Sequence, residues 1–233
     1  MPELMSAADT DAVATAVRVL RAGGTVVLPT DTVYGIAALP SRPEAIAAIV
    51  ELKQRPPQMH LAVLVADVDQ VARVSDDRRP QPRQLMAALW PGALTVVLGR
   101  ATPEADALGP GDGTIGVRCP DDDLVRQICA RVGPIAATSA NVHGAPTPAT
   151  AAEVATALGE VDLVLDGGHC PGGLASTVVD ATGPAPVVLR EGPIDEASIV
   201  AAWGARSGAN VGEQSRSVVD RAARGGTTNN RTE

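Results

Sequence analysis

The chain has 233 residues, 45% of them hydrophobic, a length that suits one large α/β domain or two small ones with a substantial core. It contains no Phe, one Tyr and two Trp, so the core has to be built from aliphatic side chains. The formal net charge of −8 excludes a uniformly basic nucleic-acid-binding protein, and any RNA contact would have to use a local patch.

The sequence also lacks membrane and export signals. No apolar run reaches the ~18–20 residues that a membrane helix needs, and residues 1–9 lack the charged start and apolar stretch of a signal peptide. Cys119, Cys129 and Cys170 have no CxxC spacing, and one would be left over from any pairing, which favours reduced thiols. We therefore expect a soluble, cytoplasmic protein without a membrane segment.

The first half of the chain alternates helical and strand-like segments. Residues 10–22 carry apolar residues at helical spacing and stop at Gly23-Gly24, which is typical of a helix end. The predicted order is helix 10–22, a short buried strand in 25–30 that runs into a loop at Pro29, helix 43–53, strand 61–65, helix 82–89, and strands 93–98 and 114–118.

The second half continues this alternation and ends in a polar tail. The predicted order is helix 121–132, a strand in 134–141 that opens into a loop, helix 150–158, strands 162–166, 176–180 and 186–190, and a last helix over 194–203. Most strands are apolar on both faces, which indicates an α/β layered domain. The strands within 162–190 have no helix between them, so we expect an antiparallel portion and a mixed sheet. One domain over 1–203 and a disordered, mildly basic, solvated tail over 204–233 are predicted.

Two polar segments near the start of the chain are candidates for a binding site. PTDTVYGI (29–36) follows a buried strand and carries four polar side chains, a pattern that fits an ordinary turn as well as a ligand loop. Lys53, the only lysine, stands beside Arg55. This pair fits either a helix C-terminus, where cations are favoured, or an anion site for a polyphosphate.

Further polar candidates follow later strands. Arg118 closes an apolar strand, where it is either a surface residue or a clamp for a carboxylate or phosphate. Ser139 and Asn141 lie in a loop just after a strand, but the G-x-S-x-G frame of a hydrolase nucleophile is missing. Ser176 and Arg190 stand at the two ends of a predicted strand pair. The sequence contains no P-loop, and its His and Cys residues show no metal-ligand spacing, so His60, His143 and His169 are interpreted as solvated loop residues.

Taken together, these segments resemble the YrdC-like family of threonylcarbamoyl-AMP synthases. The matching stretches are PTDTVYGI, the K-x-R of KQRP, LWPGALTVVL, TIGVRCP, the S-x-N of ATSANVHGAPTP, ASTVVD and LREGPI, in the family's order over residues 20–194. The resemblance implies an open, twisted, mixed α/β sheet flanked by helices around a positively lined central cavity.

The resemblance also implies substrates and roles for individual residues. ATP would be held by Lys53, Arg55, Ser139, Asn141 and Arg190, with Thr114 and Thr147 as further candidates, and Lys53 and Arg55 would be the catalytic residues. L-Threonine would be held by Thr32, Arg118 and Ser176, with Tyr34 lining the pocket. The implied reaction joins L-threonine, bicarbonate and ATP into threonylcarbamoyl-AMP with Mg²⁺, for use by the tRNA threonylcarbamoyl-transfer machinery, and it leaves room for a weak tRNA contact.

The chain departs from the family pattern in three places. Many members continue K-x-R-P with a second Lys and a Pro, where this chain has Met59 and His60. A His often found in the next strand is replaced by Leu64 or Val65. The larger members add a linker and a second C-terminal domain, so this chain resembles the single-domain type. The alternative hypotheses are a double-stranded RNA or tRNA-binding module, a carbamoyl-adenylate-forming enzyme of the HypF type, and a degenerate member that binds nucleotide without catalysis.

Overall fold

A ten-stranded sheet organises the chain in the computed structural model, which describes residues 2–54, 61–100, 108, 112–170 and 174–205. The strands are β1 (Glu3–Ser6), β2 (Val26–Leu28), β3 (Gly35–Ala38), β4 (Ala62–Leu64), β5 (Leu94–Gly99), β6 (Thr114–Arg118), β7 (Ile135–Ser139), β8 (Leu163–Asp166), β9 (Thr177–Asp180) and β10 (Val187–Arg190). The helices are α1 (Ala12–Ala22), α2 (Pro43–Leu52), α3 (Pro80–Leu89), α5 (Asp123–Val132), α6 (Ala151–Leu158) and α7 (Glu196–Gly204), with a 3₁₀ helix, η1 (Asp69–Arg73).

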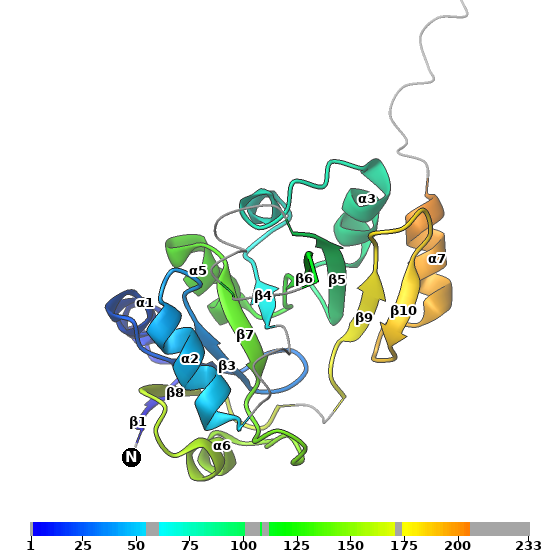
Figure 1. Cartoon of the computed structure of the whole chain (residues 1–233). Helices are drawn as coiled ribbons and strands as arrows, with labels where there is room; N and C mark the ends of the chain where they lie inside the picture. The colour runs from blue at the N-terminus through cyan, green and yellow to red at the C-terminus, as the bar shows by residue number, and fades with distance from the viewer. Residues whose placement is uncertain (1, 55–60, 101–107, 109–111, 171–173, 206–233) are drawn as a thin grey trace, which may run out of the picture.

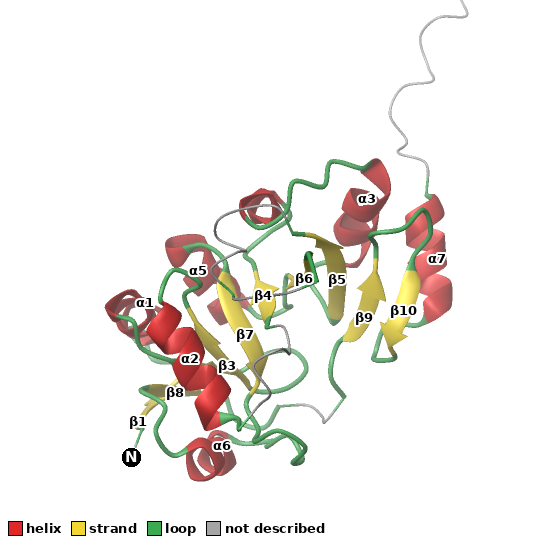
Figure 2. Cartoon of the chain, in the orientation of Figure 1, coloured by secondary structure: helices red, strands yellow, loops and turns green. Residues whose placement is uncertain are grey.

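The sheet is mixed, as predicted. Its strands follow the order β1-β8-β2-β3-β7-β4-β6-β5-β9-β10, and Figure 1 shows β1 and β10 at opposite ends. The pairs β1–β8, β2–β8, β4–β6 and β5–β9 are parallel, and the other neighbours are antiparallel. Figure 2 shows how the helices surround this sheet.

Each helix packs an apolar stripe on the sheet. Helices α1 and α5 share one cluster with strand residues such as Leu28 and Leu163. Helices α2 and α6 pack on residues of the same strands that point the other way, such as Val27 and Val164. Helices α3 and α7 form a third cluster over β5, β6 and β9. Because successive strand residues point to opposite faces, α1 and α5 lie on one face of the sheet and α2 and α6 lie on the other.

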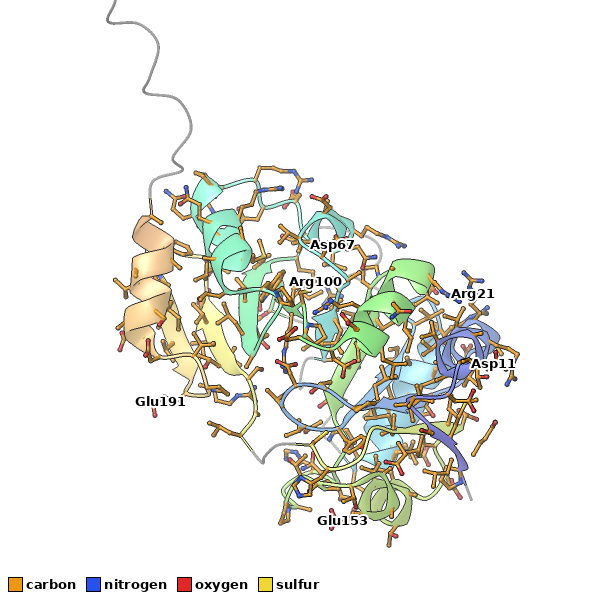
Figure 3. The ribbon with its side chains drawn as sticks, turned by 180° about the vertical axis from the view of Figure 1, so that it is seen from behind. Asp11, Arg21, Asp67, Arg100, Glu153 and Glu191 are labelled. Atoms are coloured by element: carbon orange, nitrogen blue, oxygen red, sulfur yellow. The ribbon has the colours of Figure 1, made fainter. Side chains whose placement is uncertain are left out.

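Helix ends follow the signals in the sequence. Helix α1 ends at Ala22 and is capped by Gly23, whose left-handed φ of 90° turns the chain so that the Gly24 N–H reaches the carbonyl of Val19, as the glycine pair predicts. The Asp122 side chain caps α5. Helix α6 begins with a capping box in which the side chains of Thr150 and Glu153 each accept the other residue's backbone N–H; Glu153 is labelled in Figure 3.

The structure differs from the sequence prediction at three strands. Strand β3 occupies Gly35–Ala38, partly within the segment 29–36 for which the sequence predicts a turn or loop, because both β2 and β7 pair with it. Strand β1 was not predicted, since its residues are mostly exposed, and it forms by pairing with β8. The antiparallel portion expected within 162–190 comprises β9 and β10 alone, because β8 lies in the other half of the sheet.

Helix α7 ends at Gly204, close to the predicted domain limit of residue 203. The tail predicted for 204–233 lies outside the described residues from residue 206 onward. No helix in the described part of the chain is long and apolar enough to cross a membrane.

Candidate active site

A cavity of about 570 Å³ lies over the middle strands of the sheet. Its floor is made of small residues on adjacent strands, Gly35, Ala62, Gly116 and Ala137. Ala62 pairs with Ala137, and paired residues point to the same face of a sheet. Because these side chains end at Cβ or are absent, the sheet itself forms the bottom of a chamber whose walls are loops and polar side chains.

Seven of the residues predicted for the site line this cavity. They are Thr32, Thr114, Arg118, Ser139, Thr147, Ser176 and Arg190. They come from β6, β7, β10 and the loops beside β3, β7 and β9, so motifs that are far apart in the sequence meet here. Among the described residues that line the cavity, the charged ones are Arg118, Arg190 and Asp112.

Arg118 is held in one orientation by three neighbours. Its Nη2 lies 2.5 Å from Asp31 Oδ1, and its Nη1 donates to Thr32 Oγ1 at 2.8 Å. Its Nε donates to the carbonyl of Gly92 at 3.0 Å. A Cβ on Gly92 would lie 2.8 Å from the Leu89 carbonyl oxygen, which explains the glycine in the WPG motif. The motifs PTDTV, WPGAL and TIGVR therefore build one guanidinium site.

A guanidinium carries five N–H groups, and the three bonds of Arg118 use one on each nitrogen. One N–H on Nη1 and one on Nη2 have no partner among the described residues. Two N–H groups on neighbouring nitrogens are the donors that a guanidinium needs to make two hydrogen bonds to a carboxylate. The side chain is only 7% exposed, so such bonds would be formed away from bulk water.

A chain of polar contacts joins Thr95, Ser176 and Arg190, which also line the cavity. Ser176 Oγ lies 2.8 Å from Thr95 Oγ1, and both residues are buried. Arg190 donates from Nη2 to Ser176 Oγ at 3.1 Å and from Nε and Nη2 to the Ser176 carbonyl at 3.0 and 2.8 Å. Desolvation, and secondarily the nearby Arg118 cation, lowers the pKa of Arg190. Arg118 and Arg190 each bring a guanidinium to this cavity.

The S-x-N loop forms a third wall and is tied to Lys53. Ser139 Oγ donates to Asn141 Oδ1 at 2.6 Å. Lys53 is 3% exposed, and its Nζ donates to the Ser139 carbonyl, the Asn141 carbonyl and Asn141 Oδ1 at 2.5, 2.6 and 3.1 Å. Neither Lys53 nor Asn141 is among the residues that line the cavity. The structure thus places Lys53 behind the loop rather than in the cavity.

The predicted site also includes Tyr34 and Arg55. The Tyr34 side chain is fully buried and does not line the cavity, contrary to the expectation. Its hydroxyl donates to the Gly168 carbonyl at 2.7 Å and accepts the Gly167 N–H at 3.1 Å, so it fixes a turn after β8. Burial raises the pKa of Tyr34 to about 12. Arg55, together with Met59 and His60, lies outside the described residues.

Three residues of the site were not assigned by the sequence reasoning. Asp31 was noticed only as part of a polar motif, because it lies 87 positions from Arg118 and no local signal links the two residues. Thr95 lies within LTVVL, which reads as a buried apolar strand and hides the one hydroxyl that faces the cavity. Asp112 accepts from the N–H and the hydroxyl of Thr114 at 2.9 and 2.6 Å, and it follows a segment without clear periodicity.

The described residues contain no group of three or more His, Cys, Asp and Glu side chains that could hold a metal. All three cysteines are free and buried, as the sequence predicts for reduced thiols. His143 and His169 are exposed.

Comparison with known proteins agrees with the motif pattern. The family model for Sua5, YciO and YrdC proteins, described as "Telomere recombination", matches residues 18–192. A Mycobacterium tuberculosis protein provisionally named threonylcarbamoyl-AMP synthase is 37% identical over 193 residues, which cover 82% of this chain and 89% of that protein. The Bacillus subtilis threonylcarbamoyl-AMP synthase is 37% identical over 198 residues, which cover 82% of this chain and 56% of that enzyme.

Solved structures show the same fold. Pyrococcus abyssi Sua5 in complex with L-threonine superposes with a TM-score of 0.81 and 30% identity, covering 88% of this chain and 61% of that one. A nucleotide-bound HypF superposes with a TM-score of 0.67 at 21% identity, a likeness of fold alone. The chain spans only about three fifths of the Sua5 protein but nearly all of the mycobacterial relative. From its motifs, its fold and these matches, the chain belongs to the Sua5/YciO/YrdC family.

Proposed function

We propose that this protein is a threonylcarbamoyl-AMP synthase that joins L-threonine, bicarbonate and ATP and releases pyrophosphate. The observation that carries the proposal is the guanidinium of Arg118, buried in the cavity with two N–H groups that have no partner among the described residues. Relatives at 35 to 37% identity from Bacillus subtilis and Homo sapiens are named for this activity, and the P. abyssi relative was solved with L-threonine.

In this proposal threonine binds at the Arg118 end of the cavity. The two N–H groups receive the threonine carboxylate, while Asp31 and Thr32 keep the guanidinium in plane. Ser176, with Thr95 behind it, offers hydroxyl groups to the polar part of the amino acid. Tyr34 contributes by holding the 167–168 turn and is not proposed as a direct ligand.

ATP is proposed to occupy the remainder of the cavity. Ser139, Thr114 and Thr147, which line the cavity, supply hydroxyl groups, and Arg190 supplies a guanidinium to the triphosphate. Asn141 acts by accepting the hydrogen bond of Ser139 Oγ and so orienting that hydroxyl. Arg55 is proposed to add a second guanidinium, on the strength of the family motif. Mg²⁺ enters as part of the MgATP substrate, because magnesium usually keeps several waters and binds through substrate phosphates.

The proposed chemistry has two steps. The threonine amine attacks the carbon of bicarbonate-derived CO2 and loses a proton to give a carbamate, and one water is formed overall. A carbamate oxygen then attacks the α-phosphorus of ATP, the bond to the bridging oxygen of the β-phosphate breaks, and pyrophosphate leaves with that electron pair. No residue becomes covalently attached, so the protein contributes by orienting substrates, stabilising charge and limiting water around the carbamate.

The decisive test is pyrophosphate release from MgATP with L-threonine and bicarbonate, each omitted in turn. Release that requires both, together with a product of threonylcarbamoyl-AMP mass, is the expected result. Release that persists without threonine contradicts the proposal. Carbamoyl phosphate in place of threonine and bicarbonate tests the HypF-type alternative, and binding of tRNA without turnover would favour the RNA-binding one. We propose that the product passes to the tRNA threonylcarbamoyl-transfer machinery, with at most a weak tRNA contact.

A further inference from the structure

Lys53 lies at the C-terminal end of α2, where its side chain enters the protein rather than the solvent. It is the chain's only lysine and is 3% exposed. Its three acceptors, the carbonyls of Ser139 and Asn141 and the Asn141 side-chain oxygen, match the three N–H donors of an ammonium group. These acceptors belong to Ser139, the last residue of β7, and to Asn141 in the loop that follows.

The same loop is bound to Lys53 through the backbone as well. The N–H of His143 donates to the Lys53 carbonyl at 2.8 Å. Asn141 completes a local network, because its Oδ1 accepts from Ser139 Oγ at 2.6 Å and its Nδ2 donates to the Ala145 carbonyl at 2.7 Å. Lys53 therefore holds both ends of the Ser139–His143 segment, although Lys53 and Ser139 are 86 positions apart in the sequence.

Three oxygen atoms that converge on one point repel one another unless a cation lies between them. The Lys53 ammonium supplies that cation, and the oxygens in turn compensate its removal from water. If Lys53 donated to a phosphate instead, one of these short bonds would have to break, leaving a partly buried carbonyl without its donor. The geometry therefore favours an internal cation over a phosphate ligand.

We propose that Lys53 is a positioning residue: it fixes the Ser139–Asn141 loop in the conformation that binds the nucleotide and does not itself contact the triphosphate. This inference rests on the proposed function for its account of what the loop binds. It replaces the direct catalytic role that the family resemblance implied for Lys53. It predicts that the loop loses its order when Lys53 is replaced, even when no nucleotide is present.

The first test is amide hydrogen exchange of the free protein, with Lys53→Met beside wild type. Lys53→Met removes the ammonium and keeps an unbranched side chain. The matched control is Arg18→Met, which removes an exposed cation from α1. We expect faster exchange over residues 139–145 in Lys53→Met only. Unchanged exchange in that segment would overturn the proposal, and neither outcome depends on turnover.

A double-mutant cycle separates positioning from direct contact. If Lys53 acts through Asn141, Lys53→Met and Asn141→Ala each raise the KM for ATP about tenfold, and the double variant stays near tenfold because the two residues act as one unit. The KM for threonine stays within about twofold of wild type. A rise of about a hundredfold in the double variant, the product of two independent effects, would overturn the proposal.

Amine labelling keeps the proposal testable if Lys53→Met does not fold. Because Lys53 is the only lysine, an amine-reactive ester followed by peptide mass spectrometry reports on Lys53 apart from the N-terminal amine. We expect Lys53 of the native wild-type protein to stay unlabelled with and without MgATP, and to be labelled after denaturation. Labelling of the free native protein that MgATP suppresses would show a direct nucleotide contact and overturn the proposal.

Discussion

Arg118 and Asp31 form an ion pair inside the protein, with 2.5 Å between Nη2 and Oδ1 and side-chain exposures of 7% and 17%. The guanidinium is therefore charge-compensated before any substrate carboxylate arrives. This pairing lowers the cost of burying a cation in the cavity, and it leaves the N–H groups for the substrate in place. Asp31 is not among the residues that line the cavity. Replacing Asp31 therefore tests the ion pair without removing a group that lines the cavity.

Arg118→Lys is expected to raise the KM for threonine by at least about tenfold, because an ammonium cannot replace a planar fork that binds a carboxylate through two parallel bonds. The KM for ATP should change much less. Initial-rate measurements with each substrate varied in turn check this. A larger effect on ATP than on threonine would mean that Arg118 serves the nucleotide instead.

Asp31→Asn is expected to lower the free energy of unfolding by on the order of 3 kcal/mol, since it leaves the largely buried Arg118 cation without its anion. The control is Asp123→Asn, which removes the carboxylate that pairs with Arg126 at an 83% exposed position. That change should cost less than about 1 kcal/mol. Urea unfolding of the three proteins decides the matter, and equal losses would refute the special role of the Asp31 pair.

Thr95→Val is expected to raise the KM for threonine several-fold while the protein stays folded, because it removes the hydroxyl that holds Ser176 Oγ and keeps the side-chain volume. Thr95→Ser keeps the hydroxyl and should remain close to wild type. Parallel threonine titrations, with thermal unfolding as a check on folding, make the comparison. Similar kinetics for Val and Ser would show that the hydroxyl has no part in binding.

Tyr34 should make the protein less stable in strongly alkaline solution. Burial, as the largest cause, raises the pKa of Tyr34 from 10.0 to about 12. Folding therefore favours the protonated phenol, and its contribution is complete below pH 10 and is lost as the pH rises towards 12. Because Tyr34 is the only tyrosine, tyrosinate absorbance reports on it alone.

Unfolding measured from pH 9 to pH 12 should show a steeper loss for wild type than for Tyr34→Phe. The buried cysteines, such as Cys119 with its pKa raised by burial to about 11, act in the same direction in both proteins and cancel in the comparison. Identical slopes, or a tyrosinate titration near pH 10 in the native protein, would contradict the predicted shift.

Gly192→Ala is expected to destabilise the protein by about 2 to 3 kcal/mol and to reduce nucleotide binding. A Cβ at this position would lie 2.3 Å from the Thr177 backbone nitrogen and 2.6 Å from the Ala175 carbonyl oxygen, so the strand that carries Arg190 would have to shift. Gly99→Ala, where nothing lies within 4 Å of the added Cβ, is the control. Denaturant unfolding and ATP titration of both variants provide the check.

The sequence predicted the helices and most strands because their apolar residues repeat locally. It failed at β3, where TDTVYGIAA carries turn-like residues and the strand depends on two partners that lie elsewhere in the chain. The motifs pointed to seven residues that the structure places around one cavity. They could not indicate that the partners of Arg118 lie 26, 86 and 87 residues away, or that Lys53 would be covered by a distant loop. These contacts are set by the sheet order, which no local pattern contains.

The small residues of the cavity floor set how much space a substrate has, whereas other residues, such as Arg118, supply the groups that bind it. A Cβ added at Gly116 would meet the Thr95 methyl at 3.1 Å and the Ala62 Cβ at 4.0 Å, yet it would leave the partners of Arg118 unchanged. Single methyl groups on β4, β6 or β7 would therefore trim the chamber in small steps. Such positions give a route to enzymes that accept narrower amino acids while the anion-binding groups remain as they are.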